Sequence, residues 1–300
     1  MPIDSNPSSD PAPDFSGLWI PLVTPFRERA VDHDALARLV EHLSPSGIAG
    51  FVVCGSTGEA AALDADEQLA VLATVARAAP GLPRIMGLSG YHLGKTLERV
   101  RELGGHDLAG LLVPAPSYIR PSQAGLLDWF GAIADAAAQP LLVYDIPYRT
   151  GVAIARETLL SLAAHPNIRA IKDCGGDMAK TRSLIADGRL QVLAGEDALL
   201  FATVAEGGAG AIAASAHLQT GRFVEVLRLL GAGRLPEARA AWQPLLPLIE
   251  AMFADANPGP LKAALALQGL LEEELRSPMT RVAPEPRARL LEVLARFSRP

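Results

Sequence analysis

The amino-acid sequence predicts a (β/α)8 barrel with a helical extension at its C-terminus. Eight short apolar runs alternate with helix-like stretches between residues 15 and 233. These runs are continuously apolar, which is typical of parallel strands that are covered on both faces. Eight successive β/α units of this kind are the pattern of a closed barrel. A doubly wound open sheet is the structural alternative, because it is built from the same units.

The expected elements follow one another at regular spacing. Strands are expected at residues 18–23, 48–54, 84–88, 110–114, 141–147, 168–173, 191–195 and 210–215. Between the first two strands, Leu36, Leu39 and Leu43 recur on one helical face. Asp64 and Glu67 have the spacing of a capping box that opens the next helix. Further helices are expected at residues 95–103, 122–137, 156–164, 178–186, 198–205 and 219–230.

The chain is expected to have three parts. Residues 1–14 are expected to be a disordered tail, residues 15–233 the barrel, and residues 234–300 a set of amphipathic helices that pack on it. The glycine-rich run GGAG at residues 207–210 precedes the last expected strand. It would therefore lie at the N-terminal face of the barrel, where packing is a better explanation than phosphate binding.

Composition and charge exclude several classes of protein. With 49% apolar and 20% charged residues among 300, the chain is expected to be an ordinary globular protein. The net charge of -6 and the lack of a Lys/Arg run exclude a nucleic-acid partner. Cys54 and Cys174 form no CxxC motif and are expected to be buried thiols. Without a signal-peptide pattern or an apolar run of about 18 residues, the protein is expected to be cytoplasmic, with no membrane partner.

Five segments would bring chemically useful residues to the C-terminal face of the barrel, where barrel enzymes carry their catalytic groups. Lys172 ends the sixth expected strand, and Tyr144 lies near the end of the fifth. The other three are the segment GSTGE at residues 55–59 after the second strand, Tyr118 after the fourth, and Gly195 at the end of the seventh. The barrel fold therefore predicts that these five segments meet.

Lys172 has two explanations. Most lysines lie at the surface, but Lys172 alone among the four lysines is expected to end a strand, whereas Lys95 and Lys180 lie in helix-like, polar stretches. Desolvation can lower the lysine pKa by several units from about 10.4, so that a neutral amine is present near pH 7. Such an amine can attack a keto group to form a Schiff base. On a 2-oxo acid, the imine acts as an electron sink, and the resulting enamine can attack an aldehyde.

This chemistry needs a proton donor and groups that bind anions. Tyr144 is a candidate proton shuttle, with an aromatic core residue as the alternative. In GSTGE, backbone N–H groups and the hydroxyls of Ser56 and Thr57 could surround a carboxylate, although a plain turn with a hydroxyl cap has the same pattern. Arg149 in IPYRTG could bind the carboxylate of a second substrate, with a solvated loop arginine as the alternative.

The sequence gives no indication of a metal or cofactor site. No HxxxH pair, no cluster of Asp, Glu and His, and no Ser-His-Asp arrangement is evident, so catalysis is expected to need neither a metal nor a cofactor. Three of the histidines are expected at the surface, namely His33, His42 and His165.

Six segments carry a resemblance to a known family. GSTGEA, PSYIRPSQAG, YDIPYRTG, AIKDCGGD, LAGEDA and NPGPLK occur in this order. Together they resemble the dihydrodipicolinate synthase and N-acetylneuraminate lyase family of class I, Schiff-base aldolases. The resemblance extends over nearly the whole chain. It implies a (β/α)8 barrel, a homotetramer, and pyruvate as the first substrate.

The resemblance also implies roles for individual residues. Lys172 matches the imine-forming lysine of the family, Tyr144 matches its proton-donating tyrosine, and Thr57 would hold the pyruvate carboxylate. In a synthase, Ser56, Tyr144 and Tyr118 would form a proton relay, with Tyr118 reaching in from a neighbouring subunit. The positions that line the pyruvate pocket are matched by Gly195 and Ile212.

The prediction of the second substrate depends on Arg149. Synthases of the family use an arginine in this motif to bind aspartate semialdehyde, so the resemblance favours that aldehyde. The alternatives are an N-acetylneuraminate lyase or 2-keto-3-deoxy sugar acid aldolase, and a non-catalytic protein that binds 2-oxo acids. Asp145 stands where the family commonly has Asn, and Asp173 where the synthases commonly have Glu. Lysine inhibition is expected to be weak or absent, because the positions of the allosteric cleft are occupied by Ala65, Gln68, Tyr91, Lys95 and Ser117.

Overall fold

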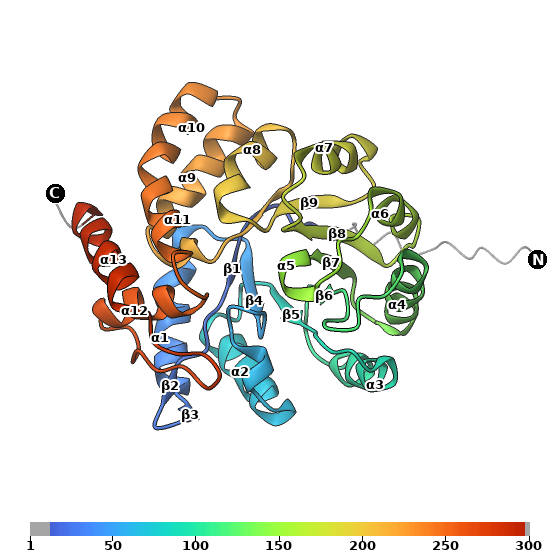
Figure 1. Ribbon diagram of the computed structural model, residues 1–300, viewed down its shortest axis with the longest axis horizontal. Coiled ribbons are helices and arrows are strands. Elements are labelled where there is room, and N and C mark those ends of the chain that lie inside the picture. The colour runs from blue at the N-terminus through green and yellow to red at the C-terminus, as the bar shows by residue number, and fades with distance from the viewer. Residues whose placement is uncertain (1–12, 298–300) are drawn as a thin grey trace, which may run out of the picture.

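The computed structural model describes residues 13–297 and contains a closed barrel of eight parallel strands (Figure 1). The barrel closes because β1 pairs with β10 on one side and with β4 on the other. This closure confirms the predicted (β/α)8 fold and excludes the open doubly wound sheet. In the order of their hydrogen bonding, the strands are β1 (Gly17–Pro21), β10 (Gly210–Ile212), β9 (Gln191–Ala194), β8 (Ile168–Asp173), β7 (Leu141–Asp145), β6 (Gly110–Pro114), β5 (Arg84–Gly87) and β4 (Gly50–Val53).

Helices surround the barrel and continue beyond it. The helices of the barrel are α1 (His33–Leu43), α2 (Ala65–Ala78), α3 (Leu93–Leu103), α4 (Gln123–Ala136), α5 (Pro147–Thr150), α6 (Arg156–Leu162), α7 (Met178–Asp187), α8 (Leu200–Ala205) and α9 (Thr220–Gly231). Four more form the C-terminal extension, namely α10 (Leu235–Trp242), α11 (Leu246–Met252), α12 (Gly259–Leu267) and α13 (Pro284–Phe297). A short antiparallel hairpin of β2 (Phe26–Arg27) and β3 (Ala30–Val31) precedes α1.

Local signals in the sequence produce the expected structures. Asp64 accepts a hydrogen bond from the Glu67 backbone N–H at 2.8 Å, and Glu67 accepts one from the Asp64 N–H at 3.1 Å, so the predicted capping box opens α2. At the N-terminal face, a Cβ on Gly210 would lie 2.0 Å from the Gly17 carbonyl oxygen. The glycine-rich run at residues 207–210 therefore serves close packing, as predicted.

The core has two layers. Side chains from the strands fill the barrel interior, including Trp19, Leu142 and Ile212. A larger cluster fills the space between the barrel and the helices. Both cysteines are buried thiols, as expected. His42 is exposed as predicted. His33 and His165 are partly exposed at the surface and hydrogen-bond to the Thr74 hydroxyl and the Asp135 carboxylate.

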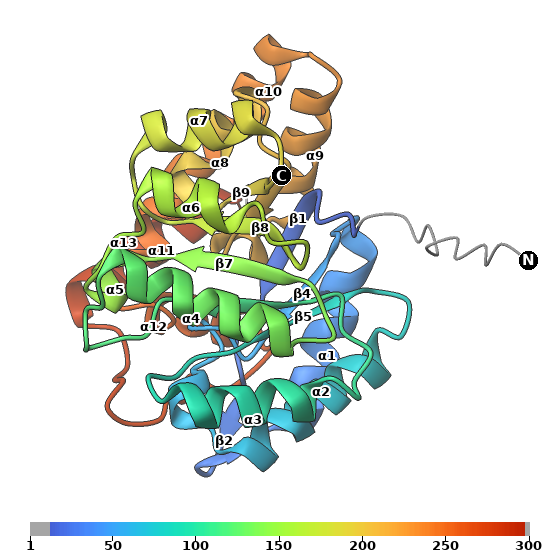
Figure 2. The same cartoon turned by 90° about the vertical axis from the view of Figure 1, so that its right-hand side faces the viewer.

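The C-terminal extension reaches the C-terminal face of the barrel. Figure 2 shows α5 and α12 at the same end of the barrel. The predicted division at residue 233 falls in the turn between α9 and α10 and stays a prediction, and most of the expected tail at residues 1–14 lies outside the described residues. No helix within residues 13–297 is long and apolar enough to cross a membrane.

Candidate active site

Lys172 and Tyr144 face each other from neighbouring strands. β7 and β8 pair in parallel with Tyr144 opposite Lys172, and both side chains are buried in the barrel. The Lys172 Nζ lies 4.5 Å from the centroid of the Tyr144 ring. The amine and the phenol thus meet inside the barrel at its C-terminal face, where a bound substrate could touch both.

Burial perturbs both groups in the direction that imine chemistry needs. Desolvation lowers the pKa of Lys172, and Asp197 and Glu196 oppose the shift through their negative charge. The same burial raises the pKa of Tyr144 well above its ordinary value, although a hydrogen bond with Ser56 opposes this shift. A larger fraction of neutral amine is therefore present near pH 7 than in an exposed lysine, while the phenol stays protonated.

The GSTGE loop after β4 has the conformation of a tight binding turn. A Cβ on Gly58 would lie 2.8 Å from the Leu22 carbonyl oxygen, so the loop needs glycine at this position. The Thr24 hydroxyl donates to the Gly58 carbonyl at 2.7 Å and fixes the loop to the end of β1. Ser56 hydrogen-bonds with Tyr144, and Thr57 is buried. The Ser56 hydroxyl is therefore close to the Tyr144 phenol, whereas the expected role of Thr57 stays a prediction.

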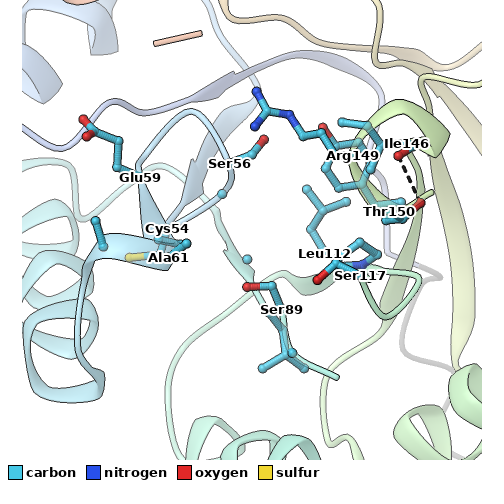
Figure 3. Close-up of a pocket in the computed structure, with 18 of the residues that line it drawn as sticks. Cys54, Ser56, Glu59, Ala61, Ser89, Leu112, Ser117, Ile146, Arg149 and Thr150 are labelled. Atoms are coloured by element: carbon cyan, nitrogen blue, oxygen red, sulfur yellow. Dashed lines mark hydrogen bonds between the residues drawn. The ribbon is translucent and has the colours of Figure 1, made fainter. Parts of the chain in front are cut away.

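A cavity of about 370 Å³ lies beside Tyr144, which is one of its lining residues. Its lining comes from the loops after β4, β5, β6 and β7 and from the C-terminal extension. Figure 3 shows Ser56, Ser89, Ser117 and Arg149 among the side chains around it. The lining includes five hydroxyl side chains, namely Ser56, Ser89, Ser117, Tyr144 and Thr150, and two guanidinium groups, those of Arg149 and Arg276. Guanidinium groups can bind the carboxylate of a substrate.

Tyr118 does not take part in this cavity within its own chain. It follows β6 with a φ of 73° and is 93% exposed, whereas its neighbour Ser117 lines the cavity. The expected role of Tyr118 in the site of a neighbouring subunit stays a prediction, and its exposure in a single chain is compatible with it.

Gly195 lies against the base of the Lys172 side chain. A Cβ on Gly195 would lie 2.4 Å from the Cys174 Sγ and 2.8 Å from the Lys172 Cγ, so only glycine leaves room for the lysine. Ile212 is fully buried in the same interior cluster as Tyr144. The expected role of Gly195 and Ile212 as walls of the pyruvate pocket stays a prediction.

Two polar residues of the site were not predicted from the sequence. Asn257, which precedes α12, donates from its side-chain amide to the Thr57 hydroxyl at 3.0 Å and lines the cavity. Glu196 follows Gly195 and hydrogen-bonds with Cys174 and Tyr148. The segments NPGPLK and LAGEDA contained both residues, but nothing in the sequence alone indicated that their side chains face the site.

Comparison with known proteins agrees with this geometry. The model of the dihydrodipicolinate synthetase family matches residues 14–296. The chain belongs to this family. Among the curated relatives of the dihydrodipicolinate synthetase family, a protein of Pelobacter propionicus named 4-hydroxy-tetrahydrodipicolinate synthase is 36% identical and covers 94% of this chain and 99% of its own length. A synthase of Sorangium cellulosum is 38% identical, over 94% of this chain and 96% of its own.

Solved structures of the family have the same fold. The 4-hydroxy-tetrahydrodipicolinate synthase of Methylacidiphilum fumariolicum SolV superimposes with a TM-score of 0.91 at 32% identity, over 94% of this chain and 96% of its own. The dihydrodipicolinate synthase of Aquifex aeolicus has a TM-score of 0.91 at 31% identity, over 94% and 98% of the two chains. The family resemblance in the sequence is thereby confirmed.

Two expectations stay predictions. Among the described residues, no group of three or more His, Cys, Asp or Glu side chains could hold a metal ion. Catalysis without a metal or cofactor is compatible with this finding but is not tested by it. Weak or absent inhibition by lysine also remains to be measured.

Proposed function

We propose that this protein is a 4-hydroxy-tetrahydrodipicolinate synthase, which condenses pyruvate with L-aspartate 4-semialdehyde for lysine biosynthesis. The observation that carries the proposal is the buried Lys172 amine 4.5 Å from the centroid of the Tyr144 ring. The proposed class is a lyase of the class I aldolase type. Arg149 at the cavity favours an aldehyde that carries a carboxylate.

The first step joins pyruvate to the enzyme. The neutral Lys172 amine attacks C2 of pyruvate, the C2 oxygen leaves as water, and a protonated imine remains. The Thr57 hydroxyl and the loop N–H groups are proposed to hold the pyruvate carboxylate, with Gly195 and Ile212 as walls. Tyr144 is proposed to donate the proton that the departing oxygen needs.

The second step forms the carbon–carbon bond. The pyruvate methyl group loses a proton to the relay of Tyr144 and Ser56, and the electron pair moves toward the iminium nitrogen to give an enamine. The enamine carbon then attacks the aldehyde carbon, whose oxygen takes up a proton. Finally, the amino group of the semialdehyde attacks C2, closes the ring and releases Lys172. One water leaves in all, and no cofactor takes part.

Trapping of the imine tests this proposal. Borohydride reduction in the presence of pyruvate is expected to add a stable pyruvate-derived mass at Lys172. Turnover with aspartate semialdehyde, and none with N-acetylneuraminate, would support the synthase. Turnover of N-acetylneuraminate would instead establish a lyase. An adduct without turnover of either substrate would establish a binding protein.

Replacing Arg149 with alanine is expected to raise the KM for aspartate semialdehyde at least about tenfold, because a charge-assisted contact with a carboxylate is lost. Imine trapping with pyruvate should remain intact, since pyruvate is proposed to bind elsewhere. The exposed Arg156, which pairs with Glu157 at the start of α6, provides the control substitution to alanine. Loss of imine trapping in the Arg149 variant would refute this division of roles.

We also propose that the enzyme is a homotetramer in which Tyr118 completes the proton relay of a neighbouring copy. Its 93% exposure in the single chain leaves its phenol free for this role. Tyr118→Phe and Lys172→Met would each be inactive alone. Mixed and reassembled from the separated subunits, they are expected to regain about a quarter of wild-type activity, since half of random pairs are mixed and each has one intact site. No recovery in demonstrably mixed oligomers would show that Tyr118 serves its own chain or none.

A further inference from the structure

Three buried charged groups lie on the outer face of β7 and β8, directly behind Lys172 and Tyr144, which we call the reactive pair. Asp145 ends β7, Asp173 ends β8, and Lys180 lies in the first turn of α7. The Lys180 ammonium contacts the Asp145 carboxylate, and its Nζ lies 3.8 Å from the Asp173 Oδ1. We call this set the charged triad. Lys180 lies in a helix with polar neighbours, as expected, but its side chain is only 8% exposed.

Hydrogen bonds saturate the two carboxylates. The Asp145 Oδ1 accepts from the Ile154 backbone N–H at 3.2 Å. The Asp173 Oδ1 accepts from the Gly175 N–H at 2.8 Å, and its Oδ2 accepts from the Thr181 hydroxyl at 2.7 Å. A buried ionic group with its hydrogen bonds complete has one well-defined position. Each carboxylate of the charged triad is therefore fixed in place.

The backbone around the charged triad leaves no room for another arrangement. A Cβ on Gly175 would lie 2.5 Å from the Lys180 Nζ and 3.0 Å from both the Asp145 Oδ2 and the Asp173 Oδ1. Gly175 thus lies against all three charged groups, which explains why a glycine follows Cys174 at this position. A side chain here would separate Lys180 from both carboxylates.

The register of the strands couples the charged triad to the reactive pair. The β7–β8 ladder shifts between Leu141 and Leu142, so the start of the ladder is irregular. At its end, Tyr144 pairs with Lys172 on the inner face, and the two aspartates pair immediately after them on the outer face. Because successive side chains point to opposite faces, a slip of one residue would turn Lys172 out of the barrel. An ion pair that holds the two strands together on the outer face therefore also fixes the register of Lys172 against Tyr144 on the inner face.

We propose that the charged triad is a positioning device that holds the Lys172 amine and the Tyr144 phenol in the alignment needed for proton transfer. Among the described residues, it is the only ion-paired set whose carboxylates come from two neighbouring strands of the barrel. Lys180 contacts carboxylates of the two strands that carry Lys172 and Tyr144. This inference rests on the proposed function, because it assigns Tyr144 the proton transfers of that reaction.

Replacing Lys180 with methionine is expected to impair proton transfer more than imine formation. Imine formation needs an accessible amine, whereas proton transfer depends on alignment, and a displacement of about 1 Å can slow such a step about 100-fold. We expect kcat to fall at least tenfold, with the KM for pyruvate changed less than twofold. Borohydride trapping at saturating pyruvate should stay complete. Exchange of the pyruvate methyl protons with deuterium, followed by NMR, should slow by the same factor as kcat.

Two further variants make the test decisive. Asp145→Asn retains the acceptor for the Ile154 N–H and removes the charge that Lys180 contacts, so it should show the same split even if Lys180→Met fails to fold. Lys95→Met is the matched control, since the exposed Lys95 lies in the first turn of α3. Unchanged kcat and exchange in a folded variant of the charged triad, with only a lower melting temperature, would overturn the proposal. Failure of imine trapping in the wild type and the Lys95 control would instead refute the proposed function.

Discussion

Replacing Lys172 with methionine is expected to abolish imine trapping and to lower kcat/KM by at least about 10⁴-fold, the order of loss seen when a nucleophile is removed. Methionine has a similar length and no amine, so the pocket keeps its shape while the bond to C2 cannot form. Intact mass after borohydride treatment and steady-state turnover measure the two effects. Binding of pyruvate without covalent attachment should persist, because its carboxylate site is unchanged.

The same substitution is expected to stabilise the fold. Lys172 is buried, and desolvation lowers its pKa, which means that the folded state binds the lysine proton less tightly than the unfolded chain does. Removing the amine should raise the free energy of unfolding by about 1 kcal/mol, as when a strained catalytic group is replaced. Equilibrium denaturation in urea measures the difference.

The stability difference between Lys172→Met and the wild type is expected to depend on pH. Above the folded pKa of Lys172, the unfolded chain binds more protons than the native state, so wild-type stability rises with pH until about pH 10.4. The advantage of the methionine variant should therefore be largest at low pH and narrow as the pH rises. Lys95→Met, which changes an exposed lysine, should leave both stability and activity near wild type. An advantage that grows with pH would contradict a lowered pKa.

The sequence was sufficient to predict the barrel and the positions of Lys172 and Tyr144 at its C-terminal face, because both predictions depend on local patterns. Continuous apolar runs predict buried parallel strands, and a lysine or tyrosine at the end of such a run is carried to the C-terminal face by the fold itself. The positions of Lys172 and Tyr144 could therefore be predicted without knowledge of tertiary contacts.

The predicted ends of the strands were less accurate. The strand expected at residues 210–215 ends at Ile212, because the chain turns into a short 3₁₀ helix from Ser215.

The groups that hold the site in place could not be predicted, because their partners are distant in the sequence. Lys180 and Lys262 lie on helices where either could face solvent, and only packing shows that both are buried against carboxylates. Asn257 reaches Thr57 across 200 positions of the chain. Tyr118 was placed correctly in its loop, but the direction of its side chain depends on backbone geometry that the sequence does not indicate.

Lys262 joins the C-terminal extension to the loop that is proposed to bind pyruvate. The side chain of this α12 residue is fully buried, and its Nζ lies 2.5 Å from the Glu59 Oε1. It also donates to the Glu274 carbonyl at 2.8 Å and lies 4.1 Å from the centroid of the Phe26 ring. Glu59 ends the GSTGE loop, so this ion pair holds the loop against the extension.

Replacing Lys262 with methionine is expected to lower the free energy of unfolding by about 3–5 kcal/mol, because Glu59 is left charged, buried and without its cation. The KM for pyruvate should rise as well, since the loop that carries Thr57 loses its attachment. Urea denaturation and steady-state kinetics measure both effects. The exposed pair of Arg228 and Glu225 is the matched control, and Arg228→Met should have little effect on either quantity.

A second substitution distinguishes two causes of the lower stability of Lys262→Met, the unpaired Glu59 charge and the lost contacts of the lysine side chain. Glu59→Gln in the Lys262→Met background removes the unpaired charge while keeping the side chain's size, so most of the lost stability should return. Recovery of the KM for pyruvate along with stability would show that the uncompensated charge displaced the loop. If the double variant is no more stable than Lys262→Met alone, the buried lysine stabilises the fold through its contacts with Phe26 and Glu274 rather than by neutralising Glu59.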